Sequence, residues 1–350
     1  MPNQKGKVAL ASSMMALALL AGCQQGTNVS NEPSKPPVEM LKEGAANLTA
    51  VNSDKFDIAL MADIKDPVSG NVKFDARLEG SADKKDLADP KLNLKFNGNF
   101  DSGAGQGGSA QLEVRMDKTN LFFNAMKLDV KGETLPPEVV TYLNKWWKIA
   151  IPAGTLEQMK AEMPSDAMMQ SQEAEMKKAI AESNFISDAK FVGLEDVKGE
   201  KSYHYTANLD KKAFLAFIQK VSAEQGQTIS AEEMKQAEAD MEKVDMKFDG
   251  WVNASTNTLN KVKVELNAKS TSASEASGVM SLEATIYDVN KPVTIEAPAN
   301  ATDFPVEQFM MPIMMMMQGA GAMPTDPSMM DPNSALLDSG DLTGTQAMGQ

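Results

Sequence analysis

Strict alternation of apolar and polar side chains is the feature that most limits how this chain can fold. In the stretch NVKFDARLEG, the apolar residues Val72, Phe74, Ala76 and Leu78 alternate with polar and charged residues. A repeat of two residues puts every apolar side chain on one face of an extended strand. Strands of this kind are typical of antiparallel sheets that pack one face and leave the other to water.

The same pattern recurs along the chain and predicts about eleven strands, most of them in hairpin order. We expect these strands at residues 54–65, 71–80, 91–100, 111–116, 120–130, 145–150, 189–197, 201–208, 245–253, 259–268 and 278–288. Because each strand is apolar on one side only, the sheet needs a cover on that side.

Helical spacing of apolar residues supplies candidates for that cover. The clearest is KKAFLAFIQKV, in which Phe214, Phe217, Ile218 and Val221 share one face and Asp210 can cap the amino-terminal end. Further helices are expected at 38–48, 155–163, 166–180 and 231–241. The last of these follows a capping-box signature formed by Ser230 and Glu233.

The amino terminus has the pattern of a bacterial export signal. Lys5 and Lys7 precede a mostly apolar run over 8–20, which is too short to span a bilayer. The sequence Leu-Ala-Gly-Cys that follows resembles the lipobox, and its Cys23 is the only cysteine of the chain. We therefore predict a signal peptide at 1–22 that is removed, and a lipid-modified Cys23 that becomes the new amino terminus. The alternative is a secreted protein without lipid, whose cysteine is incidental.

Lipid modification would place the protein on the extracytoplasmic face of the cell membrane. Two or three acyl chains such as palmitate form a durable anchor, whereas a single chain binds only marginally. Residues 23–37 then form a lipidated, flexible tether, and 38–304 form one folded domain. Removing the signal peptide removes two lysines and no acids, so the formal charge falls from −14 to −16. This acidity disfavours nucleic-acid binding.

Residues 305–350 differ in composition from the rest of the chain. They contain ten of the 26 methionines and no lysine or arginine, and they show no lasting periodicity after Met317. We expect a disordered tail. Its stretch FMMPIMMMMQ leaves three interpretations open: contact with the membrane or the domain, low-complexity sequence without a defined role, and Cu(I) binding by clustered thioethers.

No catalytic motif emerges from the sequence. GAGQGG at 103–108 has the glycine spacing of a dinucleotide-binding loop, but the strand QLEVRM follows where that motif needs a helix, so we expect a hairpin loop. His204 is the only histidine, and alternation places it on the strand face opposite Tyr203 and Tyr205, where we expect a surface histidine. We predict no catalytic residue, metal or cofactor, and a non-enzymatic role.

The lipobox, the hairpin strands and the helices inserted in the second half together resemble the LolA-like superfamily, and within it the LppX and LprG group of envelope lipoproteins. The stretches LNKWWKI, YHYTANLDKKAFLAFI and NKPVTIEAP carry this resemblance. In LNKWWKI, Trp146 and Trp147 alternate, so we expect at least one to be buried. The resemblance implies an α+β fold, in which a strongly curved antiparallel half-barrel has helices covering its concave face. It also implies that acyl chains or other lipid lie between sheet and helices.

The resemblance assigns the ligand lining to apolar residues of strands and helices. These are Phe56, Ile58, Leu60, Phe74, Leu78, Leu94, Phe96, Val114, Met159, Met163, Phe214, Phe217 and Ile218. Periodicity alone does not distinguish a lined pocket from a solid core, because both bury the same residues. The expected function is binding or transfer of a lipid or other hydrophobic ligand. The alternative is a tethered structural or interaction module with a solid core.

Overall fold

The computed structural model describes residues 30–67, 70–86, 89–103, 105–155, 158, 166–224, 227–270 and 276–305. The chain divides into two units, Met1–Asp303 and Phe304–Gln350, and every helix and strand named below belongs to the first. The predicted signal peptide and lipobox lie outside the described residues, as do nearly all of the tail and most of the predicted helix at 155–163.

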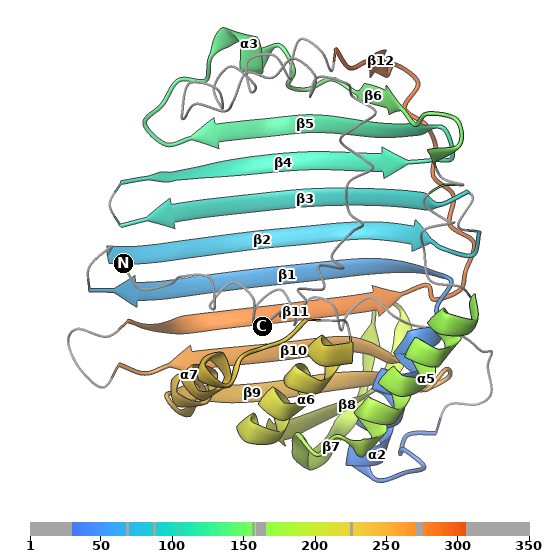
Figure 1. The fold of residues 1–350 in the computed structure, drawn as a ribbon, viewed down its shortest axis with the longest axis vertical. Coiled ribbons are helices and arrows are strands. Elements are labelled where there is room, and N and C mark those ends of the chain that lie inside the picture. Colours follow the sequence, from blue (N-terminus) through green and yellow to red (C-terminus); the bar gives the residue numbers. More distant parts are fainter. Residues whose placement is uncertain are drawn as a thin grey trace, which may run out of the picture. The chain divides into compact units, whose positions relative to one another are not determined.

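One sheet of twelve strands forms the framework of the described part of the chain, in the order β12-β6-β5-β4-β3-β2-β1-β11-β10-β9-β8-β7 (Figure 1). The strands are β1 (Ser53–Asp66), β2 (Gly70–Asp83), β3 (Lys91–Ser102), β4 (Gly107–Met116), β5 (Asn120–Val130), β6 (Trp147–Ala150), β7 (Ile186–Val197), β8 (Glu200–Leu209), β9 (Val244–Asn253), β10 (Leu259–Ala268), β11 (Ser277–Tyr287) and β12 (Thr302–Asp303). The sheet is open, because β12 and β7 form its two edges.

All eleven predicted strands are confirmed, and they pair with their neighbours in antiparallel fashion. The two residues of β12 are an addition, since they are too few to show a period, and they pair with β6 in parallel. GAGQGG at 103–108 spans the connection between β3 and β4 and the first two residues of β4, and the two strands form a hairpin as expected.

Register aligns the apolar residues of successive strands into rows on one face of the sheet. One such row runs from β3 to β7 through Phe96, Leu78, Ile58, Ala284, Val262, Gly250, Tyr205 and Phe191. A shift of one residue would turn a whole strand inside out, so the alternation itself specifies this register.

Helices lie on one face of the sheet, over β7 to β11 (Figure 1). They are α2 (Pro37–Ala46), the 3-10 helix η1 (Asn47–Ala50), α5 (Asp166–Glu182), α6 (Lys211–Glu224) and α7 (Ala231–Glu242), while α3 (Pro137–Val140) lies in the connection between β5 and β6. This is the predicted α+β arrangement of an open half-barrel with covering helices. Among the described residues, no helix is long and apolar enough to cross a membrane.

The predicted caps explain where two helices begin. The Glu233 backbone N–H donates to Ser230 Oγ at 3.2 Å, and the Ser230 N–H donates to Glu233 Oε2 at 2.9 Å, which completes the capping box of α7. Asp210 Oδ1 accepts a hydrogen bond from the Ala213 N–H at 2.9 Å at the start of α6. Each cap satisfies backbone donors that have no partner within the helix.

Two apolar clusters form the core. The first joins α2 to the sheet, and in it Met40, Leu41, Tyr205 and Val252 are at most 2% exposed. Helix α2 approaches closely because β9 has a glycine beneath it: a Cβ at Gly250 would lie 2.6 Å from Leu41 Cδ2. The second cluster joins α5, α6 and α7 to one another.

The expectation of at least one buried tryptophan in LNKWWKI is wrong. Trp146 and Trp147 are both half-buried, because β6 lies next to the sheet edge and has only the two-residue β12 beyond it. Each ring instead has a polar contact. The Trp147 Nε1–H donates to the Tyr142 carbonyl at 2.9 Å, and the Arg115 guanidinium lies 4.7 Å from the centre of the Trp146 ring.

Candidate functional site

An apolar cavity of about 210 Å³ lies between the helices and the strands that they cover. Strands β9, β10 and β11 line one side with residues such as Phe248, Val262 and Ala284. Helices α2, η1, α5 and α6 line the other side with residues such as Leu41 and Phe214. Sheet and helices therefore do not interdigitate completely, which ordinary protein interiors do.

Helix α6 supplies the densest part of the lining. Phe214, Phe217 and Ile218 are at most 7% exposed, and all three line the cavity. Phe185, just before β7, packs its ring 5.6 Å from the Phe214 ring and 5.0 Å from the Phe217 ring. These three rings form part of the cavity wall.

The cavity wall has few polar residues, which are Thr49, Ser222, Asn260 and Lys261. The ammonium group of Lys261 is engaged elsewhere, 2.8 Å from Glu283 Oε1 and 4.7 Å from the centre of the Trp251 ring. Asn260 Nδ2 donates to Ser202 Oγ at 3.0 Å. For comparison, an engineered apolar cavity of about 150 Å³ binds benzene.

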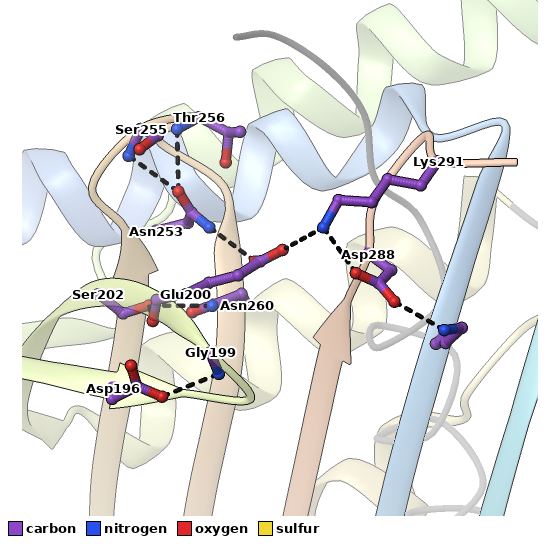
Figure 2. A network of polar contacts seen from close by, with 11 residues as sticks. Asp196, Gly199, Glu200, Ser202, Asn253, Ser255, Thr256, Asn260, Asp288 and Lys291 are labelled. Carbon is purple, nitrogen blue, oxygen red and sulfur yellow. Dashed lines mark hydrogen bonds and ion pairs between the residues drawn. The ribbon is translucent and has the colours of Figure 1, made fainter. Parts of the chain in front are cut away.

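A polar network ties together the ends of the strands that carry the cavity (Figure 2). The carboxylate of Glu200, at the start of β8, accepts from Asn253 Nδ2 at 2.8 Å and from Lys291 Nζ at 3.4 Å. Asn253 Oδ1 in turn accepts from the backbone N–H groups of Ser255 and Thr256 at 2.8 and 3.0 Å. The side chain of Asn253 thus shapes the turn between β9 and β10.

The network continues to β1 through Asp288. The ammonium groups of Lys291 and Lys55 lie 2.6 and 2.7 Å from its carboxylate oxygens. Hydrogen bonds from Lys291 and then from Lys55 lower the pKa of Asp288 below its usual value. Each of these charges faces an opposite charge, so the chemistry of the network is that of a structural clamp and not of acid–base catalysis.

His204 lies on the face of the sheet opposite Tyr203 and Tyr205, as predicted, but in a polar cluster that leaves its side chain only 14% exposed. Its ring stacks on Trp251 at 4.2 Å. Nδ1 lies 2.9 Å from Glu195 Oε1, and Nε2 lies 3.0 Å from Asp249 Oδ1. The hydrogen bond from Trp251 is the main reason why the pKa of Glu195 is lowered.

The predicted ligand residues fall into four groups. Phe214, Phe217 and Ile218 line the cavity. Phe56 and Ile58 are buried in the core beside it. Six half-buried residues share the apolar sheet face but lie outside the cavity lining: Leu60, Phe74, Leu78, Leu94, Phe96 and Val114. Met159 and Met163 lie outside the described residues.

Several lining residues were missing from the predicted set. Helix α2 and η1 contribute Leu41, Ala45 and Leu48, and α5 contributes Met176 and Ile180. The helical stripe of Leu41, Ala45 and Leu48 was visible in the sequence, but nothing in a stripe says which strands it will cover. The strand residues of β9 to β11 were missed for the same reason.

Among known proteins, the matches come from solved structures. No family model and no curated protein matches the chain. The solved structure of the lipoprotein LppX from Mycobacterium tuberculosis is 10% identical, covers 74% of this chain and 97% of its own, and has a TM-score of 0.27. That of LprF from Mycobacterium bovis is also 10% identical, covers 77% and 99%, and has a TM-score of 0.32. LppX is also a member of the group that the sequence resembles.

Proposed function

We propose that this protein is a membrane-anchored bacterial lipoprotein that binds a lipid or another hydrophobic ligand in the cell envelope without chemical conversion. The observation that carries the proposal is the apolar cavity of about 210 Å³ between α6 and strands β9 to β11. A solid core, which the alternative of a tethered interaction module requires, would leave no such cavity.

The energetic cost of an empty cavity supports a ligand. At about 24 cal/mol per Å³, a cavity of 210 Å³ that was fully enclosed and empty would cost about 5 kcal/mol relative to a filled core. Natural domains have only about 5 to 15 kcal/mol of net stability. A void of this size is therefore expensive unless an occupant makes the missing contacts.

The volume also limits what is enclosed. Since about 150 Å³ accepts the six carbons of benzene, 210 Å³ accepts about eight carbons. Burying eight methylene groups would contribute about 6 kcal/mol relative to water. The best fit is thus one segment of an acyl chain, with the remainder of the ligand outside the enclosed space.

The tether supports a position close to the membrane. The Tyr203 hydroxyl, on β8, donates to the Ser30 carbonyl at 3.0 Å, which holds the incoming chain against the domain. Between Ser30 and the proposed lipid anchor at Cys23, seven residues span at most about 25 Å when fully extended. A lipid leaving the bilayer would therefore have a short path to the domain.

Val262→Phe tests the proposal, because it adds a ring to the cavity floor. Val279→Phe is the matched control, since Val279 lies on the neighbouring strand, is 48% exposed and points to the opposite face. We expect the purified full chain to bind a dansyl-labelled fatty acid in a fluorescence titration, Val262→Phe to weaken binding by about tenfold, and Val279→Phe to leave it unchanged. Equal affinities of Val262→Phe and the parent protein, or no binding by either, would contradict the proposal.

A further inference from the structure

We propose that Asp54 binds a hydroxyl group of the ligand, so that the protein selects neutral lipids with a hydrogen-bond donor over fatty acids and other anionic lipids. This inference rests on the proposed function, because it concerns the polar end of a lipid whose acyl segment fills the cavity. It adds the chemical class of that polar end and the residue that contacts it.

Asp54 lies on the apolar face of the sheet, close to the cavity. Residues two apart on a strand point to the same face, and Phe56 and Ile58 of β1 are buried in the core beside the cavity. Phe56 pairs with Ile286 of β11, which lines the cavity. Asp54 is the next residue of β1 on this face, about 7 Å along the strand from Phe56. Its carboxyl group is therefore one row of the sheet beyond the cavity lining.

The 3-10 helix η1 brings the cavity wall to the same end of β1. Leu48 and Thr49 of η1 line the cavity, and only two residues separate the end of η1 at Ala50 from the start of β1. On the other side, Asp54 pairs with Ala82 of β2, which is itself buried. An acyl chain that extends from the cavity along β1 toward η1 would therefore meet the carboxyl group of Asp54.

The carboxylate of Asp54 is buried without a hydrogen-bond donor. Asp54 is only 3% exposed, and among the described residues none donates a hydrogen bond to it. Burial raises the pKa of Asp54, and the charge of Lys84 offsets this only in part. At Asp288, by contrast, hydrogen bonds from Lys291 and then from Lys55 lower the pKa. A buried carboxylate without a donor costs free energy, so a donor on the ligand would be bound favourably.

The charges at this position favour a neutral donor. An anionic head group, such as the carboxylate of a fatty acid, would be repelled by Asp54. An ammonium group would be attracted by Asp54 but repelled by Lys84, whose charge already acts on this carboxylate. A hydroxyl group brings no charge, and its hydrogen bond to an ionised acceptor is short and strong. The ligand that fits best is therefore a lipid with a free hydroxyl group.

A set of dansyl-labelled probes with one chain length tests this inference on the purified full chain. The set consists of a fatty alcohol, its methyl ether and the corresponding fatty acid. The alcohol has a donor, the ether has neither a donor nor a charge, and the acid has a negative charge. In fluorescence titrations at neutral pH, we expect the parent protein to bind the alcohol about tenfold more tightly than the ether or the acid.

Asp54→Leu removes both the acceptor and the charge, and leucine suits the apolar face of β1. We expect the preference for the alcohol over the ether to disappear, and the affinity for the acid to rise by about tenfold. Asp63→Leu is the matched control, since Asp63 lies on the opposite face of the same strand, where it pairs with Lys73 at 3.2 Å. This control removes the same charge from β1 and should leave all preferences unchanged.

Urea unfolding checks that the variants are folded, and Asp54→Leu should be at least as stable as the parent protein, because it removes an unpaired buried charge. The comparison of alcohol and ether on the parent protein does not depend on any variant. Equal binding of these two probes by the parent protein, or a preference that Asp54→Leu leaves unchanged, would overturn the role of Asp54 and leave the proposed function standing. Absence of binding of all the probes would overturn both.

Discussion

The close approach of α2 to β9 makes a quantitative prediction. In Gly250→Ala, the new Cβ would lie 2.6 Å from Leu41 Cδ2 and 3.1 Å from Phe248 Cε1. Leu41 is only 1% exposed and belongs to the first core cluster, so its methyl group can move only toward the cavity that it lines. Forcing an extra methyl group into a packed core costs about 1 to 3 kcal/mol.

A second glycine in a strand provides the matched control. Around Gly193, on β7, a Cβ would meet no atom within 4 Å. Alanine is favoured over glycine in a strand by about 0.5 to 1 kcal/mol, and this gain applies to both sites. We therefore expect Gly193→Ala to raise the free energy of unfolding by about 0.5 to 1 kcal/mol, and Gly250→Ala to lower it by up to about 2 kcal/mol after the same gain is included.

Urea unfolding followed by circular dichroism measures both free energies of unfolding. If the free energy falls with urea concentration at the same slope in both variants, the two proteins expose the same amount of surface on unfolding. Because Leu41 lines the cavity, Gly250→Ala should also weaken fatty-acid binding, whereas Gly193→Ala should not. Two variants of equal stability would refute the claim that α2 is packed against the backbone of β9.

Two further predictions concern a helix cap and a half-buried carboxylate. Ser230→Ala removes the capping box of α7, and urea unfolding should show that it lowers the free energy of unfolding by about 1 kcal/mol. Fatty-acid affinity should stay unchanged, because no described residue of α7 lines the cavity. A change in affinity would contradict the claim that α7 stabilises the fold without contacting the ligand. Burial alone would raise the pKa of Asp57, but hydrogen bonds from Arg77 and Lys198 outweigh it and hold the pKa below its usual value. A lowered pKa gives stability that is present above the unfolded value of about 4 and is lost as the pH falls through the folded value. Asp57→Asn should therefore reduce the loss of stability that urea unfolding measures between about pH 5 and about pH 2, and an unchanged pH profile would argue against the contribution of this carboxylate.

The sheet could be predicted from the sequence because its signal is local and repeated. In β2, the residues Val72, Phe74, Ala76 and Leu78 fix which face is apolar, and the register then follows from matching that face to β1 and β3. Only β12 was not predicted, since its two residues are too few to show a repeat of apolar and polar side chains. The capping box of α7 was equally local, and it was predicted for the same reason.

The position of the cavity could not be predicted, because it depends on contacts between distant segments. Leu78 and Val262 have the same kind of neighbours in sequence and lie in one row of the sheet, yet only Val262 lines the cavity. The difference is which helix covers each strand, and a helical stripe does not encode its partner. The prediction that one of the two tryptophans is buried was wrong for a similar reason, because alternation does not reveal that β6 lies next to the edge of the sheet.

Connectivity explains why the cavity lies over β9 to β11. Strands β1 to β5 follow one another through short hairpin connections that leave no room for a helix. Helix α5 is inserted before β7, α6 and α7 are inserted between β8 and β9, and α2 precedes β1. Helix α7 lies near β9, the strand that it leads into, whereas α2 packs on β7, β9 and β10 and not on the following β1. The helical cover therefore lies over β7 to β11 (Figure 1). The pattern within the strands makes the apolar face, and the helices that pack on β7 to β11 decide which part of that face lines the cavity.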